Sequence, residues 1–194
     1  MKKLSAYLFL ILFSFSAPSF ADDIRDFQIE GMSIGDSLLD FFNEEEIRIS
    51  IKKKYYAYLP EKKFIDLEFN SSPNFKTYDA LQISIKPNDS KYIIYAVDGI
   101  LKIEDMNNCN KKINEVSVII SNQFIDATKV KQKKTKHPAD QSGKSTTWGV
   151  AFFLNEDGSV SVRCYDWHKD IEYFDSFRIS MRSFELNEWL GSGG

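Results

Sequence analysis

Cysteine, histidine and long apolar runs are scarce in this sequence. It holds 2 cysteines and 2 histidines, and its one marked apolar run extends from Leu8 to Phe15. That run is far shorter than the roughly 20 residues of a membrane-spanning helix, and no later stretch is comparably apolar. We therefore expect no transmembrane segment in the mature protein. The sequence also lacks an internal repeat, which excludes a repeat architecture.

The beginning of the chain has the pattern of a secretory signal peptide. Lys2 and Lys3 precede the apolar run, and the letters SFADD offer small residues for cleavage near Ala21. We expect residues 1–21 to be a signal peptide and the mature protein to be soluble, and either periplasmic or secreted. A lipid anchor is not expected, because a bacterial lipoprotein would carry a cysteine just after the cleavage site.

Charge gives a further exclusion. The formal net charge is −3, and removal of Lys2 and Lys3 with the signal peptide makes it more negative by two. The electrostatic field of a negatively charged protein does not favour binding to DNA, RNA or an anionic membrane. We expect no nucleic-acid partner, and the sequence indicates no cofactor.

The two cysteines, Cys109 and Cys164, predict one disulfide bond. An isolated pair in an exported protein more often forms a disulfide than two free thiols. Closing the loop between them would stabilise the fold by about 3–4 kcal/mol in the chain-entropy model.

Periodicity predicts strands in hairpins, interrupted by helices. Alternating and β-branched residues indicate strands at 64–69, 81–85, 92–97 and 100–103, with a turn at Asp98-Gly99, a second hairpin from TTWGVAFFL and SVSVRCYDW, and a last strand FRISMRS. Apolar spacing of three or four residues predicts a short helix after Asp36, a long one from Met106 to Phe124 and a short one at 185–190.

These elements predict an α+β fold in one domain, residues 22–194. Strands that arrive in hairpins form an antiparallel sheet, and we expect the one long and two short helices to pack on one face of it. Residues 126–145 lose apolar periodicity and are rich in lysine, so we expect a mobile basic loop there. Residues 191–194 form a flexible tail.

The letters GMSIG, from Gly31 to Gly35, match the Gly-x-Ser-x-Gly pattern of serine hydrolases. That pattern works where a strand delivers the serine into a strained turn. Ser33 lies close to the mature N-terminus with no preceding sheet, so we interpret it as a turn residue and expect no catalytic residue.

Two weaker candidates involve metal and anion binding. In CYDWHKD, the residues Cys164, Asp166, His168 and Asp170 would share one side of a strand, but a disulfide would remove the cysteine as a ligand, so we expect no metal site. His137 is expected to be a solvated loop residue. Lysines of the expected basic loop could bind an anionic partner or form only a soluble basic segment. They are Lys129, Lys131, Lys133, Lys134 and Lys136.

Aromatic residues give the best candidate for binding. If the second hairpin keeps an even register, Trp148, Phe152, Tyr165 and Trp167 lie on the side opposite Cys164. That side is either buried core or an open surface for a protein, peptide or small-molecule partner. Because aromatic and arginine side chains dominate binding energy, the candidate binding residues are Trp148, Arg163, Tyr165 and Trp167.

Several stretches, IEGMSIGDSLLDFFNEEEI, YDALQISI with KYIIYAVDGI, CNKKINEV and RCYDW, resemble a family of small exported bacterial proteins with no established activity. The resemblance covers most of the mature chain. It implies one exported α+β domain and transfers no catalytic residue, cofactor or partner. The first helix is also similar to small periplasmic modules of the outer-membrane assembly and lactamase-inhibitor type, an analogy of fold alone.

The sequence thus predicts an exported, non-enzymatic binding or interaction module of unknown ligand. The alternative is a small serine hydrolase that uses Ser33.

Overall fold

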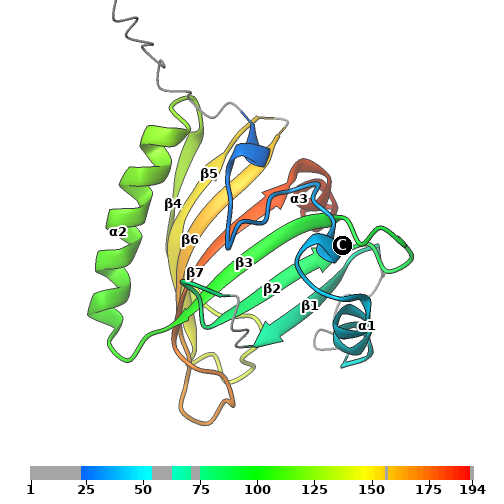
Figure 1. Ribbon diagram of the computed structural model, residues 1–194. Coiled ribbons are helices and arrows are strands. Elements are labelled where there is room, and N and C mark those ends of the chain that lie inside the picture. The colour runs from blue at the N-terminus through cyan, green and yellow to red at the C-terminus, as the bar shows by residue number, and fades with distance from the viewer. Residues whose placement is uncertain (1–22, 54–62, 71–74, 156, 193–194) are drawn as a thin grey trace, which may run out of the picture.

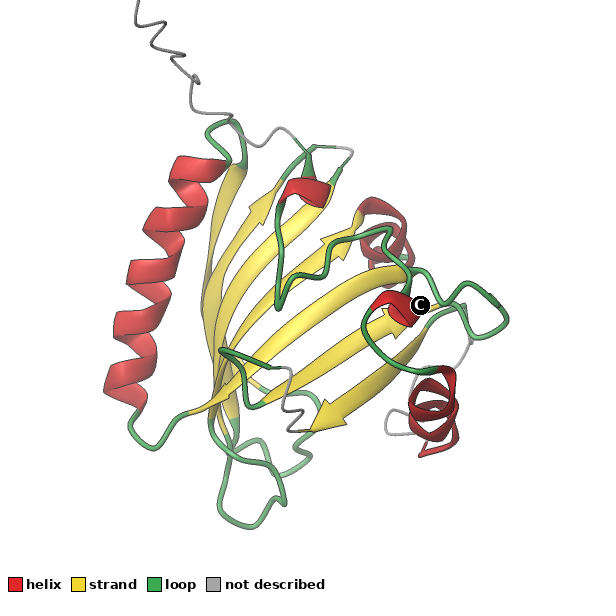
Figure 2. Ribbon diagram, viewed as in Figure 1, coloured by secondary structure: helices red, strands yellow, loops and turns green. Residues whose placement is uncertain are grey.

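The chain folds around one antiparallel sheet (Figures 1 and 2). The computed structural model describes residues 23–53, 63–70, 75–155 and 157–192. Seven strands occur in the order β1-β2-β3-β7-β6-β5-β4. They are β1 (Ile65–Asn70), β2 (Ala80–Ile85), β3 (Ile94–Lys102), β4 (Thr128–Lys136), β5 (Thr146–Phe153), β6 (Gly158–Asp166) and β7 (Ser176–Ser183).

Helices occur before, between and after the strands. The described α-helices are α1 (Glu44–Lys53), α2 (Met106–Gln123) and α3 (Phe184–Gly191), and the short 3-10 helices are η1 (Ile24–Asp26) and η2 (Leu38–Asp40). The α+β class and the antiparallel sheet are confirmed, as are both predicted hairpins. The first predicted helix is divided into η2 and α1. The predicted signal peptide lies outside the described residues.

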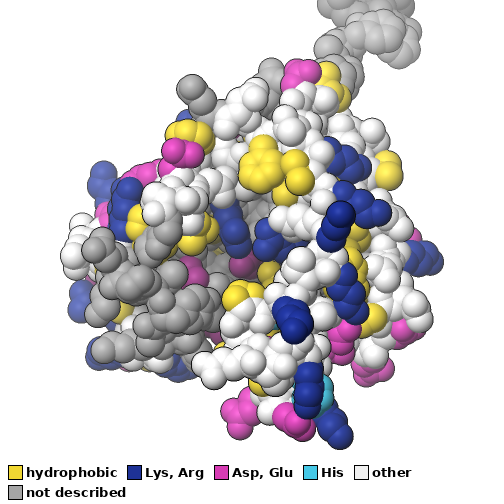
Figure 3. Space-filling view, turned by 180° about the vertical axis from the view of Figure 1, so that it is seen from behind, with side chains coloured by type: hydrophobic (Ala, Val, Ile, Leu, Met, Phe, Trp, Pro, Cys, Tyr) yellow, Lys and Arg dark blue, Asp and Glu magenta, His cyan; other side chains and the backbone are white. Residues whose placement is uncertain are grey.

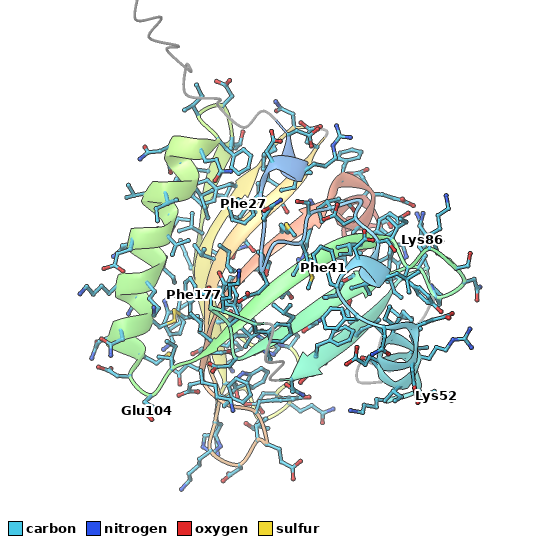
Figure 4. The ribbon with its side chains drawn as sticks, in the orientation of Figure 1. Phe27, Phe41, Lys52, Lys86, Glu104 and Phe177 are labelled. Carbon is cyan, nitrogen blue, oxygen red and sulfur yellow. A yellow bond between two sulfur atoms is a disulfide. The ribbon has the colours of Figure 1, made fainter. Side chains whose placement is uncertain are left out.

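One face of the sheet, the apolar face, carries the main core. Strand alternation directs Ile83, Val162 and Ile179 to it, and all three are buried. The helix α2 packs on β5, β6 and β7, and the N-terminal segment crosses the sheet on the same side (Figure 1). Phe27 from that segment and Phe177 from β7 both point into this core (Figure 4).

A disulfide joins the two layers of this core, as the sequence predicts. Cys109 of α2 is bonded to Cys164 of β6, with their Cα atoms 6.0 Å apart. Both residues are fully buried. The long helix is therefore held covalently against the C-terminal part of β6.

The last helix, α3, lies on the opposite face, which differs from the expectation that all helices share one face. Leu186 and Trp189 pack with Phe64 and Ala96 in a separate apolar cluster. Ala96 and Val97 are neighbours in β3, so their side chains point to opposite faces, and Val97 belongs to the main core. The helix α3 follows β7 directly and folds back over its other side.

The predicted turn at Asp98-Gly99 is wrong, because β3 runs through it without a break. These two residues pair with β2 on one side and with β7 on the other. A Cβ atom at position 99 would lie 2.8 Å from the ring of Tyr78. Glycine is thus required by a close side-chain approach within a central strand, which local turn propensity does not reveal.

The predicted loop at 126–145 is also wrong in its first half. Residues Thr128–Lys136 form β4, which pairs with β5 at the edge of the sheet. Almost every side chain of β4 is exposed, so the strand needs no alternation of apolar and polar residues. Lysines on an exposed edge also hinder pairing with another chain.

Candidate functional site

The second face of the sheet, the polar face, carries charged and polar side chains. They alternate with core residues in five strands and comprise Asp66, Gln82, Ser84, Asp98, Arg163, Arg178 and Arg182. Most of them line a cavity of about 250 Å³, the polar cavity, together with aromatic residues of the neighbouring loops and of α3. Figure 3 shows this face as a hollow with basic and acidic side chains inside it.

The floor of the polar cavity contains two carboxyl groups, from the strands on either side of β2. Asp66 accepts hydrogen bonds from the Ser84 hydroxyl and from Gln82 Nε2, the latter at 2.9 Å. The amide nitrogen of Gln82 is thereby used, whereas its oxygen Oε1 is buried without a partner. Asp98, opposite Gln82 in the register, is 8% exposed, and its Oδ1 atom is also buried without a partner.

Two arginines of β7 stand beside these carboxyl groups. Arg178 and Arg182 flank Ser180, which pairs with Asp98. The guanidinium carbon of Arg178 lies 4.4 Å from the centre of the Tyr165 ring, a cation–π contact. Among the described residues, no ion pair joins either arginine to Asp66 or Asp98.

Aromatic rings form one wall of the polar cavity. The ring of Trp167 lies 4.3 Å from that of His137 and 4.7 Å from that of Tyr173, measured between centroids. Tyr165, one step earlier on the same face, is stacked with Trp167 at 6.3 Å. His137 is therefore half-buried among rings, and the expectation of a solvated histidine is wrong.

A buried carboxylate holds the loop that carries His137. Asp140 accepts hydrogen bonds from the Ser142 amide at 2.8 Å and from the amide and hydroxyl of Ser145 at 2.7 and 2.6 Å. These hydrogen bonds, first those from Ser142, hold the pKa of Asp140 well below its usual value. The Ser145 hydroxyl also accepts from the amide of His168 at 3.0 Å, which fixes one loop of the wall to the next.

Burial sets the ionisation of two groups in the polar cavity. It raises the pKa of Asp66, an effect that the hydrogen bonds from Ser84 and Gln82 only partly offset. Burial also lowers the pKa of His137, and the nearby charge of Arg178 acts in the same direction. Since His137 Nδ1 accepts from the amide of Ala139 at 3.2 Å, the neutral ring carries its proton on Nε2.

Buried polar atoms without a partner are concentrated on the polar face. Six such side-chain atoms occur among the described residues, and five belong to this face. The five are Gln82 Oε1, Asp98 Oδ1, Thr147 Oγ1, Arg163 Nε and Trp167 Nε1. Such atoms are rare in folded proteins, and each carries a desolvation cost unless another molecule satisfies it.

Three of the four predicted binding residues lie on the polar face, and one does not. Tyr165 and Trp167 line the polar cavity, and Arg163 pairs with Arg178 beside it. Trp148 instead pairs with Cys164 and so lies on the apolar face, where its Nε1 donates to Asn110 of α2 at 2.7 Å. The expected register of the hairpin was wrong by one residue, which moves a side chain to the other face.

Ser33 lies away from the polar cavity. It is 5% exposed, and its hydroxyl donates to the carbonyl of Phe27 at 3.3 Å. Gly31 and Gly35 have φ values of 82° and 94°, so the glycines shape a turn. None of the hydrogen bonds of the described chain joins Ser33 to a histidine.

The predicted absence of a metal site concerns the CYDWHKD stretch. Cys164 is consumed by the disulfide, and His168 Nδ1 lies 3.3 Å from a carboxylate oxygen of Asp170. Within the described ranges, no group of three or more histidine, cysteine or carboxylate side chains is arranged to hold a metal ion.

Sequence reasoning missed the charged centre of the polar cavity. Asp66, Asp98, Arg178 and Arg182 each occupy a polar position in a strand whose alternate positions are apolar. Alternation alone does not distinguish such positions from solvent-exposed ones, and Asp98 was predicted to lie in a turn. The signal that distinguishes them is the small side chain of Ser180 between the two arginines of FRISMRS.

Comparison with known proteins found no matching family, no matching curated protein and no matching solved structure. The resemblance to exported bacterial proteins stays a prediction. In the described part of the chain, no helix has the length and apolar character needed to cross a bilayer. Function is therefore argued from the polar cavity.

Proposed function

We propose that this protein is an exported, non-enzymatic binding protein that takes a small molecule into the polar cavity. The observation that carries the proposal is that, among the described residues, three buried polar atoms without partners belong to side chains that line this cavity: Gln82 Oε1, Asp98 Oδ1 and Trp167 Nε1. Buried donors and acceptors of this kind are normally paired, and a bound polar molecule would pair them. The aromatic wall supplies apolar contact area, as is usual in small-molecule sites.

Binding is favoured over catalysis by the contacts of the polar groups. His137 Nδ1 is used by the Ala139 amide, and in the described residues its ring contacts Tyr165 and Trp167 rather than a serine hydroxyl. Among the described residues, the serine hydroxyl that is bound to a cavity carboxyl group is that of Ser84, whose partner Asp66 has a raised pKa. The hydrolase alternative has less support, since the Ser33 hydroxyl is buried and bonded to a carbonyl.

Export is supported by two independent features. The N-terminal sequence has the order of charge, apolar run and small residues found in signal peptides. The chain also contains one disulfide, a bond that persists in oxidising compartments.

The three tryptophans allow a direct test of the proposed site. Trp167 and Trp189 line the polar cavity, whereas Trp148 lies on the apolar face. We would screen the mature protein by thermal shift against organic acids, amino acids, sugars and nucleosides, and follow each hit by tryptophan fluorescence. A cavity ligand should still change the fluorescence of Trp148→Phe and should not change that of the double variant Trp167→Phe, Trp189→Phe.

Two results would count against the proposal. One is a hit whose fluorescence change disappears in Trp148→Phe and persists in the double variant. The other is the absence of any hit, together with no non-covalent adduct in native mass spectra of protein purified from its own cells.

A further inference from the structure

We infer that the ligand of the polar cavity is a small zwitterion of the α-amino acid type, with its ammonium group at Gln82 and Asp98 and its carboxylate at Arg178 and Arg182. This inference rests on the proposed binding function and adds the chemical class. It follows from two groups of side chains that line the same cavity. In the described residues, the acidic pole has hydrogen-bond acceptors without partners, and the basic pole has two arginines that form no ion pair.

The acidic pole consists of acceptors alone. Gln82 Oε1 and Asp98 Oδ1 are neighbours across β2 and β3, and both are buried without a hydrogen bond. The other end of the Gln82 side chain is fixed by its bond to Asp66, so Oε1 cannot be exchanged for the amide nitrogen without losing that bond. Two adjacent acceptors, one of them on a carboxylate, match an ammonium group, which offers three donors.

The basic pole consists of two guanidinium groups. Arg178 and Arg182 occupy the positions on either side of Ser180 and line the same cavity. In the described residues neither forms an ion pair, and Arg178 donates a hydrogen bond through its Nε atom to the Ser176 hydroxyl at 3.5 Å. The terminal nitrogens of a guanidinium match the two oxygens of a carboxylate.

The two poles belong to the same small cavity. Asp98 pairs directly with Ser180, the residue between the two arginines, and the side chains of both poles line the polar cavity of about 250 Å³. One small molecule in this cavity would therefore be in reach of both poles. A phosphate or a simple dicarboxylate would leave the acidic pole unpaired and would be repelled by Asp98.

Most of the other residues that line the polar cavity are apolar or aromatic, and the cavity is small. Phe64, Leu186 and Trp189 pack at the α3 side, and Tyr165 and Trp167 form the opposite wall. A cavity of about 250 Å³ suits a single amino acid with an apolar or aromatic side chain better than a longer peptide or a lipid. We therefore use phenylalanine as the probe.

The test removes each charge of the probe in turn. Isothermal titration at pH 7 would compare L-phenylalanine, N-acetyl-L-phenylalanine, which lacks the ammonium group, and L-phenylalanine amide, which lacks the carboxylate. Loss of either charged contact should weaken binding by about tenfold or more, because hydrogen bonds to charged groups contribute more than neutral ones. The inference of a zwitterionic ligand would be overturned by equal binding of the three compounds, by tightest binding of the amide, or by no binding of any of them.

Variants then assign the two poles. Asp98→Asn should weaken phenylalanine by about tenfold and leave the N-acetyl compound nearly unchanged, whereas Arg182→Gln should weaken both and spare the amide. Asp170→Asn and Arg48→Gln, at exposed positions, are matched charge controls. Within each variant, the affinities for the three compounds can be compared with one another even if the variant is less stable than wild type. The titrations of the wild-type protein test the inference without any variant. A different class of hit in the thermal-shift screen would refute this inference and retain the binding function.

Discussion

Gln82 and Asp98 face each other across β2 and β3, and each has one side-chain oxygen that is buried without a hydrogen bond. Their strands carry the main core on the other face, where Leu81, Ile83 and Val97 are fully buried. The same strands thus supply both the packing that stabilises the sheet and the polar groups that we assign to binding. This division permits variants of the polar face to be tested with the core intact.

The carboxyl group of Asp66 should make stability depend on pH. Its pKa in the folded protein lies above the ordinary value of 3.8, because burial disfavours the charged form. The folded state then holds its proton more tightly than the unfolded chain, so stability decreases as the pH rises from near 3.8 through the raised pKa. Asp66→Asn removes this dependence, and its stability relative to wild type should therefore increase from pH 3 to pH 7 in urea unfolding.

The control for Asp66→Asn is Asp170→Asn, which removes an exposed carboxylate. Its stability relative to wild type should change less over the same range. A difference between wild type and Asp66→Asn that stays constant from pH 3 to pH 7 would contradict the raised pKa.

Loss of the disulfide should destabilise the protein without changing the sheet. The bond closes a separation of 55 residues, and the double variant Cys109→Ser, Cys164→Ser should lose about 3–4 kcal/mol of unfolding free energy. Urea unfolding of the oxidised wild type and the variant measures the loss, with reduced wild type as the control. A stability equal to that of oxidised wild type would show that the bond contributes nothing.

Gly149 should tolerate no side chain. A Cβ atom there would lie 2.1 Å from the carbonyl oxygen of Val162 and 2.8 Å from Cγ of Arg163. Because the first of these is backbone of the adjacent strand, Gly149→Ala should cost about 1–3 kcal/mol or more. Gly191→Ala is the matched control, since no atom lies within 4 Å of its added Cβ. Comparable unfolding midpoints for the two variants would contradict the close contact of β5 and β6.

The sequence predicted the parts of the fold that local patterns determine. The alternation in LQISI, the three- and four-residue spacing after Met106, and the isolated cysteine pair all led to the observed elements. Two of the errors share one physical cause. Asp98-Gly99 and the lysine-rich β4 are strands because of the neighbouring strands with which they pair, and the local composition of neither stretch shows that pairing.

The sequence predicted only the part of the candidate site that a local pattern determines. Tyr165 and Trp167 were found because aromatic residues alternate at the end of β6 and directly after it. Asp66, Asp98 and Arg182 come from three strands, and only the sheet order brings them into one cavity. Trp148 was misplaced because the residue count of a turn does not fix which residues pair across a hairpin.

The position of Cys164 has a consequence for when the protein can bind. This residue lies between Arg163 and Tyr165 in β6, so its bond to α2 restrains from one side the strand segment that presents the cavity wall on the other. The bond forms only where thiols are oxidised. If the chain is exported as proposed, the strand that presents the cavity wall gains this restraint, and the stability that comes with it, after the chain has left the cytoplasm.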